Sequence, residues 1–421
     1  MNPFDMRPGK GTEVIVPWRR MWPQPYDRQT VDPYTRTRVI LMNGTEFENV
    51  WFSHQFSRHS ADNELRRTLA LIRRSEQQQQ KLIAHLKPVD ETDLEHTIGY
   101  EQVAVDLTAM LAKRVCDPGI KAALDFALLE DFDHLYRYSD LLDMKTQLKA
   151  EQLVGRYTEI MPGRPTVSEH RHPYDDIRFP VMNPNAPVMD VLAVNIITAA
   201  EQQTMNYYMN TSALADDVTT QQLYQEIGMI EEQHVSHYGS LLNPGLTWLE
   251  NLLWHQYVEC YLYWSCHETE SDARIKDVWA ELFEQELTHL HIAEELLRKY
   301  EHKEWPQVIA GGGEFPEPLM LTSNIEYVRS VLTNTVNLTT SREYYVDVAE
   351  LESGADFFEY QQRVNEPVKD VMSHRVIEDY IRKNGRDYRF EVDANPIPEL
   401  RDRRHDNTSV GRTPAKVMQN V

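Results

Sequence analysis

An internal repeat, with two copies 100 residues apart, limits most strongly how this chain can fold. In each copy a predicted helix carries one glutamate, Glu101 or Glu201, and a second predicted helix follows with an acid-x-x-His pair thirty residues later. These pairs are Asp131 with His134 and Glu231 with His234. A two-helix unit must bury its apolar face against another unit, so the repeat predicts a bundle of helical hairpins.

The repeated acids fall on apolar helix faces. Glu101 shares a helical stripe with Ile98 and Val105, and Glu231 shares one with Ile227. A carboxylate that faces a core costs several kcal/mol unless its charge is compensated. Two divalent cations would cancel four carboxylates, and two neutral imidazoles would complete the ligand set. The repeat therefore predicts a buried metal site.

This ligand pattern resembles that of the ferritin-like di-metal carboxylate proteins, which include rubrerythrins, bacterioferritins, manganese catalases and di-iron oxygenases. The resemblance covers about residues 91–242 and implies two Fe or two Mn ions. The implied ligands are Glu101, Asp131, His134, Glu201, Glu231 and His234. Position 131 departs from the pattern, because it is Asp where Glu is usual. Glu130, four residues before His134, is therefore an alternative ligand.

A third, looser copy of the hairpin carries Glu259, Glu286 and His289. The short link after His234 makes its first helix antiparallel to the preceding one, so we expect hairpins one and two to form the main site. Two interpretations of the third hairpin remain open. Its acids and histidine pack against the bundle through hydrogen bonds, or two chains supply them to a second di-metal site across a homodimer two-fold axis.

The predicted fold class is mainly α: a ferritin-like helical bundle with an additional helical hairpin, a small N-terminal β-hairpin and a C-terminal helical extension. The β-hairpin is expected because Asn43-Gly44, a strong turn signal, separates two β-prone runs. The expected domains are an extended arm and β-hairpin at 1–59, a bundle of three related hairpins at 60–302, the extension at 303–400 and a mobile tail at 401–421.

Composition narrows the possible partners. The chain has 66 Asp plus Glu against 43 Lys plus Arg, a formal charge of −23, which disfavours nucleic acid and anionic membranes. We find no apolar run long enough to span a membrane and no export signal. The three cysteines show no CxxC spacing, which disfavours a zinc ribbon or a rubredoxin-type iron site. We therefore expect a soluble, cytoplasmic protein.

The resemblance implies an oxidoreductase that activates O₂ or peroxide and acts on a small organic substrate. Two alternatives stay open: peroxide detoxification of the manganese catalase or rubrerythrin type, the latter with a separate electron-donor protein, and a non-enzymatic iron-binding protein. Tyr138 and Tyr238 lie one turn after the histidines. They either pack in the core or act close to the metals as hydrogen-bond donors or redox-active groups. We also expect a homo-oligomer.

Overall fold

The computed structural model describes residues 1–9, 15–160 and 169–385, which fold mainly into α-helices. The long helices are α1 (Pro33–His59), α2 (Asn63–Ala84), α3 (Asp93–Arg114), α4 (Pro118–Thr146), α6 (Val188–Ser212), α7 (Val218–Gly239), α8 (Trp248–Thr269) and α9 (Ala273–Glu301). The short α-helices and strands are α5 (Ala150–Leu153), α10 (Ile325–Thr335), β1 (Leu338–Ser341), β2 (Tyr344–Asp347), α11 (Asp356–Asn365) and α12 (Met372–Asn384), and several short 3-10 helices lie in the connections. The mainly α class with one small β-hairpin is confirmed.

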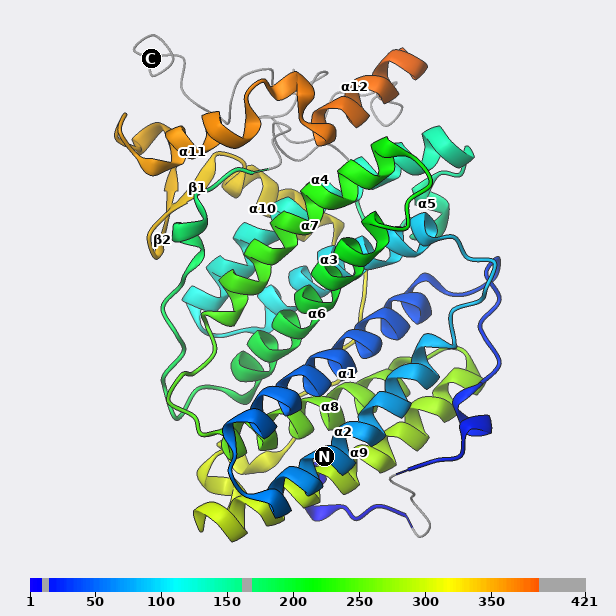
Figure 1. The fold of residues 1–421 in the computed structure, drawn as a ribbon, viewed down its shortest axis with the longest axis vertical. Coiled ribbons are helices and arrows are strands. Elements are labelled where there is room, and N and C mark those ends of the chain that lie inside the picture. Colours follow the sequence, from blue (N-terminus) through cyan, green and yellow to red (C-terminus); the bar gives the residue numbers. More distant parts are fainter. Residues whose placement is uncertain (10–14, 161–168, 386–421) are drawn as a thin grey trace.

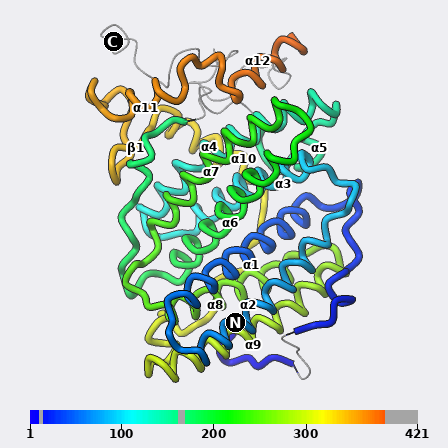
Figure 2. Tube along the Cα trace, in the orientation of Figure 1, coloured from blue at the N-terminus to red at the C-terminus, as the bar shows by residue number. Residues whose placement is uncertain are grey.

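The long helices form two four-helix bundles that lie side by side (Figures 1 and 2). Bundle A consists of α3, α4, α6 and α7, and bundle B of α1, α2, α8 and α9. Bundle A is formed by the two hairpins in the middle of the chain, α3–α4 and α6–α7. Bundle B is formed by the hairpins that precede and follow them, α1–α2 and α8–α9. Helices α1, α3, α6 and α8 meet between the bundles, and one continuous hydrophobic core runs through both.

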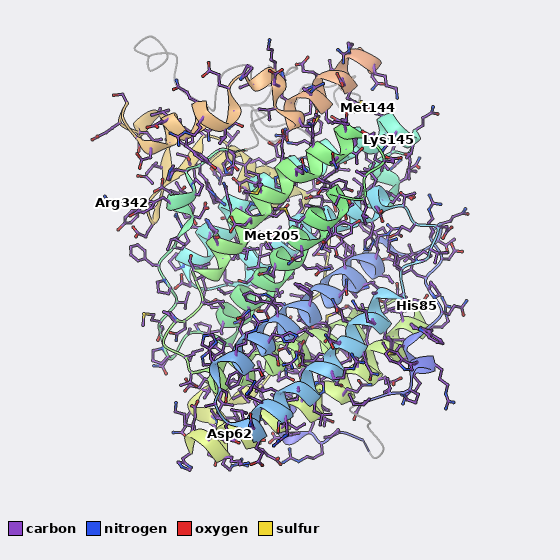
Figure 3. The ribbon with its side chains drawn as sticks, viewed as in Figure 1. Asp62, His85, Met144, Lys145, Met205 and Arg342 are labelled. Atoms are coloured by element: carbon purple, nitrogen blue, oxygen red, sulfur yellow. The ribbon has the colours of Figure 1, made fainter. Side chains whose placement is uncertain are left out.

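Each hairpin turns at an aspartate that caps its second helix. Asp62, Asp117, Asp217 and Asp272 all accept hydrogen bonds from backbone N–H groups in the first turn of α2, α4, α7 and α9. Figure 3 labels Asp62 and His85 at the two ends of α2. Because the cap fixes where a helix begins, it also fixes the level at which later side chains of that helix reach the bundle interior.

The N-terminal β-hairpin expected around Asn43-Gly44 is wrong, because these residues lie in the middle of α1. Asp32 caps this helix and Pro33 begins it. The helix is buried on several sides by both bundles, so its sequence lacks the one-sided apolar pattern that distinguishes a surface helix from a strand. Gly44 allows α1 and α6 to pack closely, because a Cβ at this position would lie 2.9 Å from Cβ of Gln203 on α6.

The observed β-hairpin is formed by β1 and β2, which pair antiparallel in the C-terminal third. Because α1 is a helix, residues 33–59 belong to a bundle, and the described part of the chain has four long helical hairpins instead of three.

The expected C-terminal extension contains α10, α11 and α12 within its described part. Helices α10 and α12 pack against α4, and α12 also contacts α7. The end of the extension, 386–400, and the expected tail, 401–421, lie outside the described residues. None of the described helices has the length and apolar character needed to cross a membrane.

Candidate metal centre

All six side chains of the predicted ligand set lie inside bundle A. Each helix contributes: Glu101 from α3, Asp131 and His134 from α4, Glu201 from α6, and Glu231 and His234 from α7. None of the six is more than 5% exposed. A carboxylate cluster buried this deeply requires cations, protons or hydrogen-bond donors to balance it.

The six residues form two groups that share Glu231. One group contains Asp131, Glu201, Glu231 and His234, the other Glu101, His134 and Glu231, and within each group the potential ligand atoms lie within 4.8 Å of one another. The shared carboxylate faces one imidazole with each oxygen. Nδ1 of His134 lies 2.9 Å from Oε1 of Glu231, and Nδ1 of His234 lies 3.1 Å from Oε2. Glu231, His134 and His234 together could therefore hold metal at either oxygen of this carboxylate.

Several carboxylate oxygens of this cluster have no hydrogen-bond partner among the described residues and could bind a cation. Oε2 of Glu101, Oδ2 of Asp131 and Oε1 of Glu201 are buried and have no hydrogen-bond partner among the described residues. Oxygen and imidazole ligands suit iron and manganese alike. The residues present therefore fit a pair of divalent metal ions.

Without a cation, protons must balance the four buried carboxylates of the cluster. Burial raises the pKa of Glu101 and Glu201 well above the ordinary value, and nearby carboxylates raise it further. Burial acts on Glu231 too, but His134 and His234 outweigh it and lower its pKa to about 2. Divalent cations in this position would favour the ionised form of all these carboxylates.

The structure separates Asp131 from its neighbour Glu130, which the sequence left as alternative ligands. Asp131 Oδ1 lies 3.1 Å from Nδ1 of His234, on the side of the cluster. Glu130 Oε2 lies 2.6 Å from Nε2, on the opposite side of the same ring. Glu130 thus orients the imidazole from behind, as carboxylates commonly do for histidines that bind metals.

Two residues that the sequence analysis did not select hold Glu130 in turn. His170 and Arg171 come from the connection between α4 and α6; His170 contacts Oε1 of Glu130, and Nη1 of Arg171 lies 3.7 Å from Oε2. Burial raises the pKa of Glu130, but His170, Arg171 and His234 together outweigh it and keep the pKa well below its usual range. The only sequence signal was the run His170-Arg171-His172 in a linker long enough to cover the bundle.

The two predicted tyrosines are buried beside the cluster without bonding to it. The hydroxyls of Tyr138 and Tyr238 have no hydrogen-bond partner among the described residues. The tyrosine that does bond to a carboxylate of the cluster is Tyr208 on α6, which donates to Glu101 and packs its ring 5.3 Å from that of Tyr138. Sequence reasoning missed Tyr208 because it lies two turns from Glu201 and outside the acid-x-x-His motif.

The third hairpin, α8–α9, lies in bundle B with Glu259, Glu286 and His289 buried. Its partner is the hairpin α1–α2 of the same chain, so a second chain is not needed to complete the bundle. The homodimer hypothesis took the missing ligands from a second chain, whereas here α1–α2 supplies the partner hairpin. Hydrogen bonds do hold these residues: Asn49 of α1 donates to Glu259 over 2.6 Å, and Nδ1 of His289 lies 3.0 Å from Glu286.

Comparison with profiles of known protein families, with curated proteins and with solved structures finds no match. The likeness to ferritin-like proteins therefore rests on the six side chains of bundle A and the helices that carry them.

Proposed function

We propose that bundle A binds two iron or two manganese ions and is the active centre of an oxidoreductase that activates O₂ or peroxide. The shared carboxylate of Glu231, with one histidine Nδ1 at each oxygen, carries this proposal. Two metal ions held here would supply two adjacent redox centres, which suits the reduction of O₂ or peroxide.

Charge supports two ions over one. The cluster holds four carboxylates and two imidazoles in an interior that water does not reach, and two divalent cations neutralise the four acids. The side chains around the cluster keep it in place. Tyr208 fixes one oxygen of Glu101, and Glu130 fixes the far nitrogen of His234.

The depth of the cluster favours a small oxidant as its direct reactant. A depression of about 360 Å³ lies at the end of bundle A where α3 and α7 begin and α4 and α6 end, and Tyr224 lines it. The ring of Tyr224 lies 5.6 Å from that of Tyr208, whose hydroxyl bonds to Glu101. Two aromatic rings, tilted at 54° to each other, lie between the depression and the cluster, which suits passage of O₂ or peroxide better than entry of a large substrate.

The test measures the metal content and the turnover of O₂ or peroxide in the wild-type full chain and in the Glu231→Gln variant. We expect about two Fe or Mn ions bound in bundle A, both lost in the variant because both share this carboxylate. The matched control is Glu232→Gln, since Glu232 is the next residue and is exposed. It should keep the metal.

The same samples separate the possible activities. Consumption of O₂ or peroxide that depends on added reductant supports an oxidase or peroxidase, and peroxide turnover without reductant supports the catalase type. Metal without turnover would leave an iron-binding protein, and no loss of metal in Glu231→Gln would contradict the proposal.

A further inference from the structure

Bundle B repeats bundle A at a constant offset of 55 residues. The caps show the offset directly, since Asp62 precedes Asp117 by 55 residues and Asp217 precedes Asp272 by the same number. In the first hairpin the positions of Glu101, Asp131 and His134 are taken in bundle B by Glu46, Glu76 and Gln79. Both acids are kept on α1 and α2, and the histidine is replaced by an amide.

The second hairpin of bundle B keeps the other histidine. The positions of Glu201, Glu231 and His234 are taken by Gln256, Glu286 and His289. Glu259 lies three residues after Gln256 and therefore on the same face of α8. Bundle B thus has one buried carboxylate on each of its four helices and one histidine, with glutamine at two positions where bundle A has candidate ligands.

In each of the four carboxylates of bundle B, one oxygen accepts a hydrogen bond and the other has no partner among the described residues. Tyr263 donates to Oε1 of Glu46, as Tyr208 does to Glu101 in bundle A. The held oxygens are Oε1 of Glu46, Oε1 of Glu76, Oε2 of Glu259 and Oε1 of Glu286. The oxygens without a partner among the described residues are Oε2 of Glu46, Oε2 of Glu76, Oε1 of Glu259 and Oε2 of Glu286.

Two amides clamp the carboxylates of α2 and α8 together. Asn49 donates to Glu76 over 2.9 Å and to Glu259 over 2.6 Å, and Gln256 donates to the same two oxygens over 3.1 and 3.3 Å. The clamp orients both carboxylates and leaves their second oxygens buried and unsatisfied, which is costly unless a cation or a proton lies there.

His289 and Gln79 both contact Oε1 of Glu286: Nδ1 of His289 lies 3.0 Å from it, and Gln79 donates to it over 2.6 Å. In bundle A the two corresponding histidines face different oxygens of Glu231. Oε2 of Glu286 therefore has no partner among the described residues. An imidazole nitrogen can bind a metal ion, whereas an amide N–H₂ group cannot.

We propose that bundle B is a second metal site, one that holds a single divalent cation through Glu76, Glu259, Glu286 and Nδ1 of His289. The second metal position of bundle A is missing here, because Gln79 turns its N–H₂ group to Glu286 where bundle A has an imidazole. Within the described ranges, three or more potential ligand atoms come within 4.8 Å of one another in bundle A alone. The side chains of bundle B must therefore close around their ion, so it binds more weakly than the pair in bundle A.

The experiment is an equilibrium titration of the metal-free full chain with Mn²⁺, in which free Mn²⁺ is measured by its six-line electron paramagnetic resonance signal. We expect three bound ions per chain, two tight and one weaker. Glu286→Gln should lose the weaker ion and keep two, and Glu231→Gln should lose the tight pair and keep one. Circular dichroism checks that each variant folds.

A gain-of-binding variant guards against loss of binding through misfolding. Gln79→His should raise the count from three to four and make the ions of bundle B magnetically coupled, because it restores the missing histidine. A wild-type count of two that Glu286→Gln leaves unchanged would overturn this inference and leave the proposal for bundle A intact. A count that Glu231→Gln leaves unchanged while Glu286→Gln lowers it by one would overturn only the proposal for bundle A.

Discussion

Bundles A and B show what happens when one helical hairpin is used four times and only some copies keep every candidate metal ligand. Both bundles bury a tyrosine-held glutamate and an acid-x-x-His pair, Glu231/His234 in one and Glu286/His289 in the other. They differ where bundle B has Gln79 and Gln256. Gln256 has the shape of the glutamate it replaces, and Gln79 supplies a hydrogen bond in place of the imidazole, so the fold is kept while candidate ligands are lost.

The largest difference we expect concerns an acid that bundle A buries away from the metal cluster. Burial raises the pKa of Asp106 on α3 from 3.8 to about 7, and the corresponding position in bundle B is Trp51. Because the folded state holds the proton more tightly, Asp106 favours folding at low pH, and this contribution is lost as the pH rises from about 4 through about 7.

Asp106→Asn should therefore gain stability relative to the wild type between pH 4 and pH 8, by at most about 4 kcal/mol. The asparagine keeps an acceptor for Thr158, which donates to Asp106 over 2.7 Å. The measurement is the free energy of unfolding in urea at both pH values, with both proteins in the same metal state. A difference that does not change with pH would contradict the raised pKa.

A smaller effect concerns metal affinity and the residue that orients His234 in bundle A, compared with its equivalent in bundle B. Glu130→Gln should weaken metal binding in bundle A by about 10- to 100-fold, because the neutral amide orients His234 less strongly than the carboxylate does. The equivalent position in bundle B is Ser75. Ser75→Ala should leave metal affinity in bundle A unchanged, and equal effects of the two substitutions would break the comparison.

The smallest effect concerns the contact between the bundles. Gly44→Ala should lower the free energy of unfolding by about 1–3 kcal/mol, because the added methyl group meets Gln203 of α6 at 2.9 Å. The matched control is Gly239→Ala at the end of α7, where the nearest atom, in Thr198, lies 4.0 Å away. Chemical denaturation distinguishes them, and equal stability of the two variants would show that the bundles are not in close contact at α1.

The sequence predicted bundle A well because its signal is local and repeated. Two acid-x-x-His pairs at an offset of 100 residues placed six side chains in one cluster, and the structure brings all six together. It did not distinguish Asp131 from Glu130, because which side of an imidazole a carboxylate reaches depends on the packing of four helices.

The first hairpin of bundle B, α1–α2, was missed for two physical reasons. Helix α1 is buried on several sides and contains Asn43-Gly44, so its pattern imitates a β-hairpin. Gln79 then breaks the acid-x-x-His motif after Glu76, and a search for histidines passes over the hairpin. The offset of 55 residues that relates the second copy of the hairpin to the third also relates the hairpin α1–α2 to the first copy. In α1–α2, however, Gln79 stands where the first copy has His134.

The most direct test of the account is a crystal structure of the manganese-loaded chain with an anomalous difference map recorded above the manganese edge. We predict two strong peaks in bundle A on either side of the Glu231 carboxylate and one weaker peak in bundle B next to His289. A map with no peak between α3, α4, α6 and α7 would show that the buried carboxylates are balanced by protons, and would contradict the metal centre on which the proposed function rests.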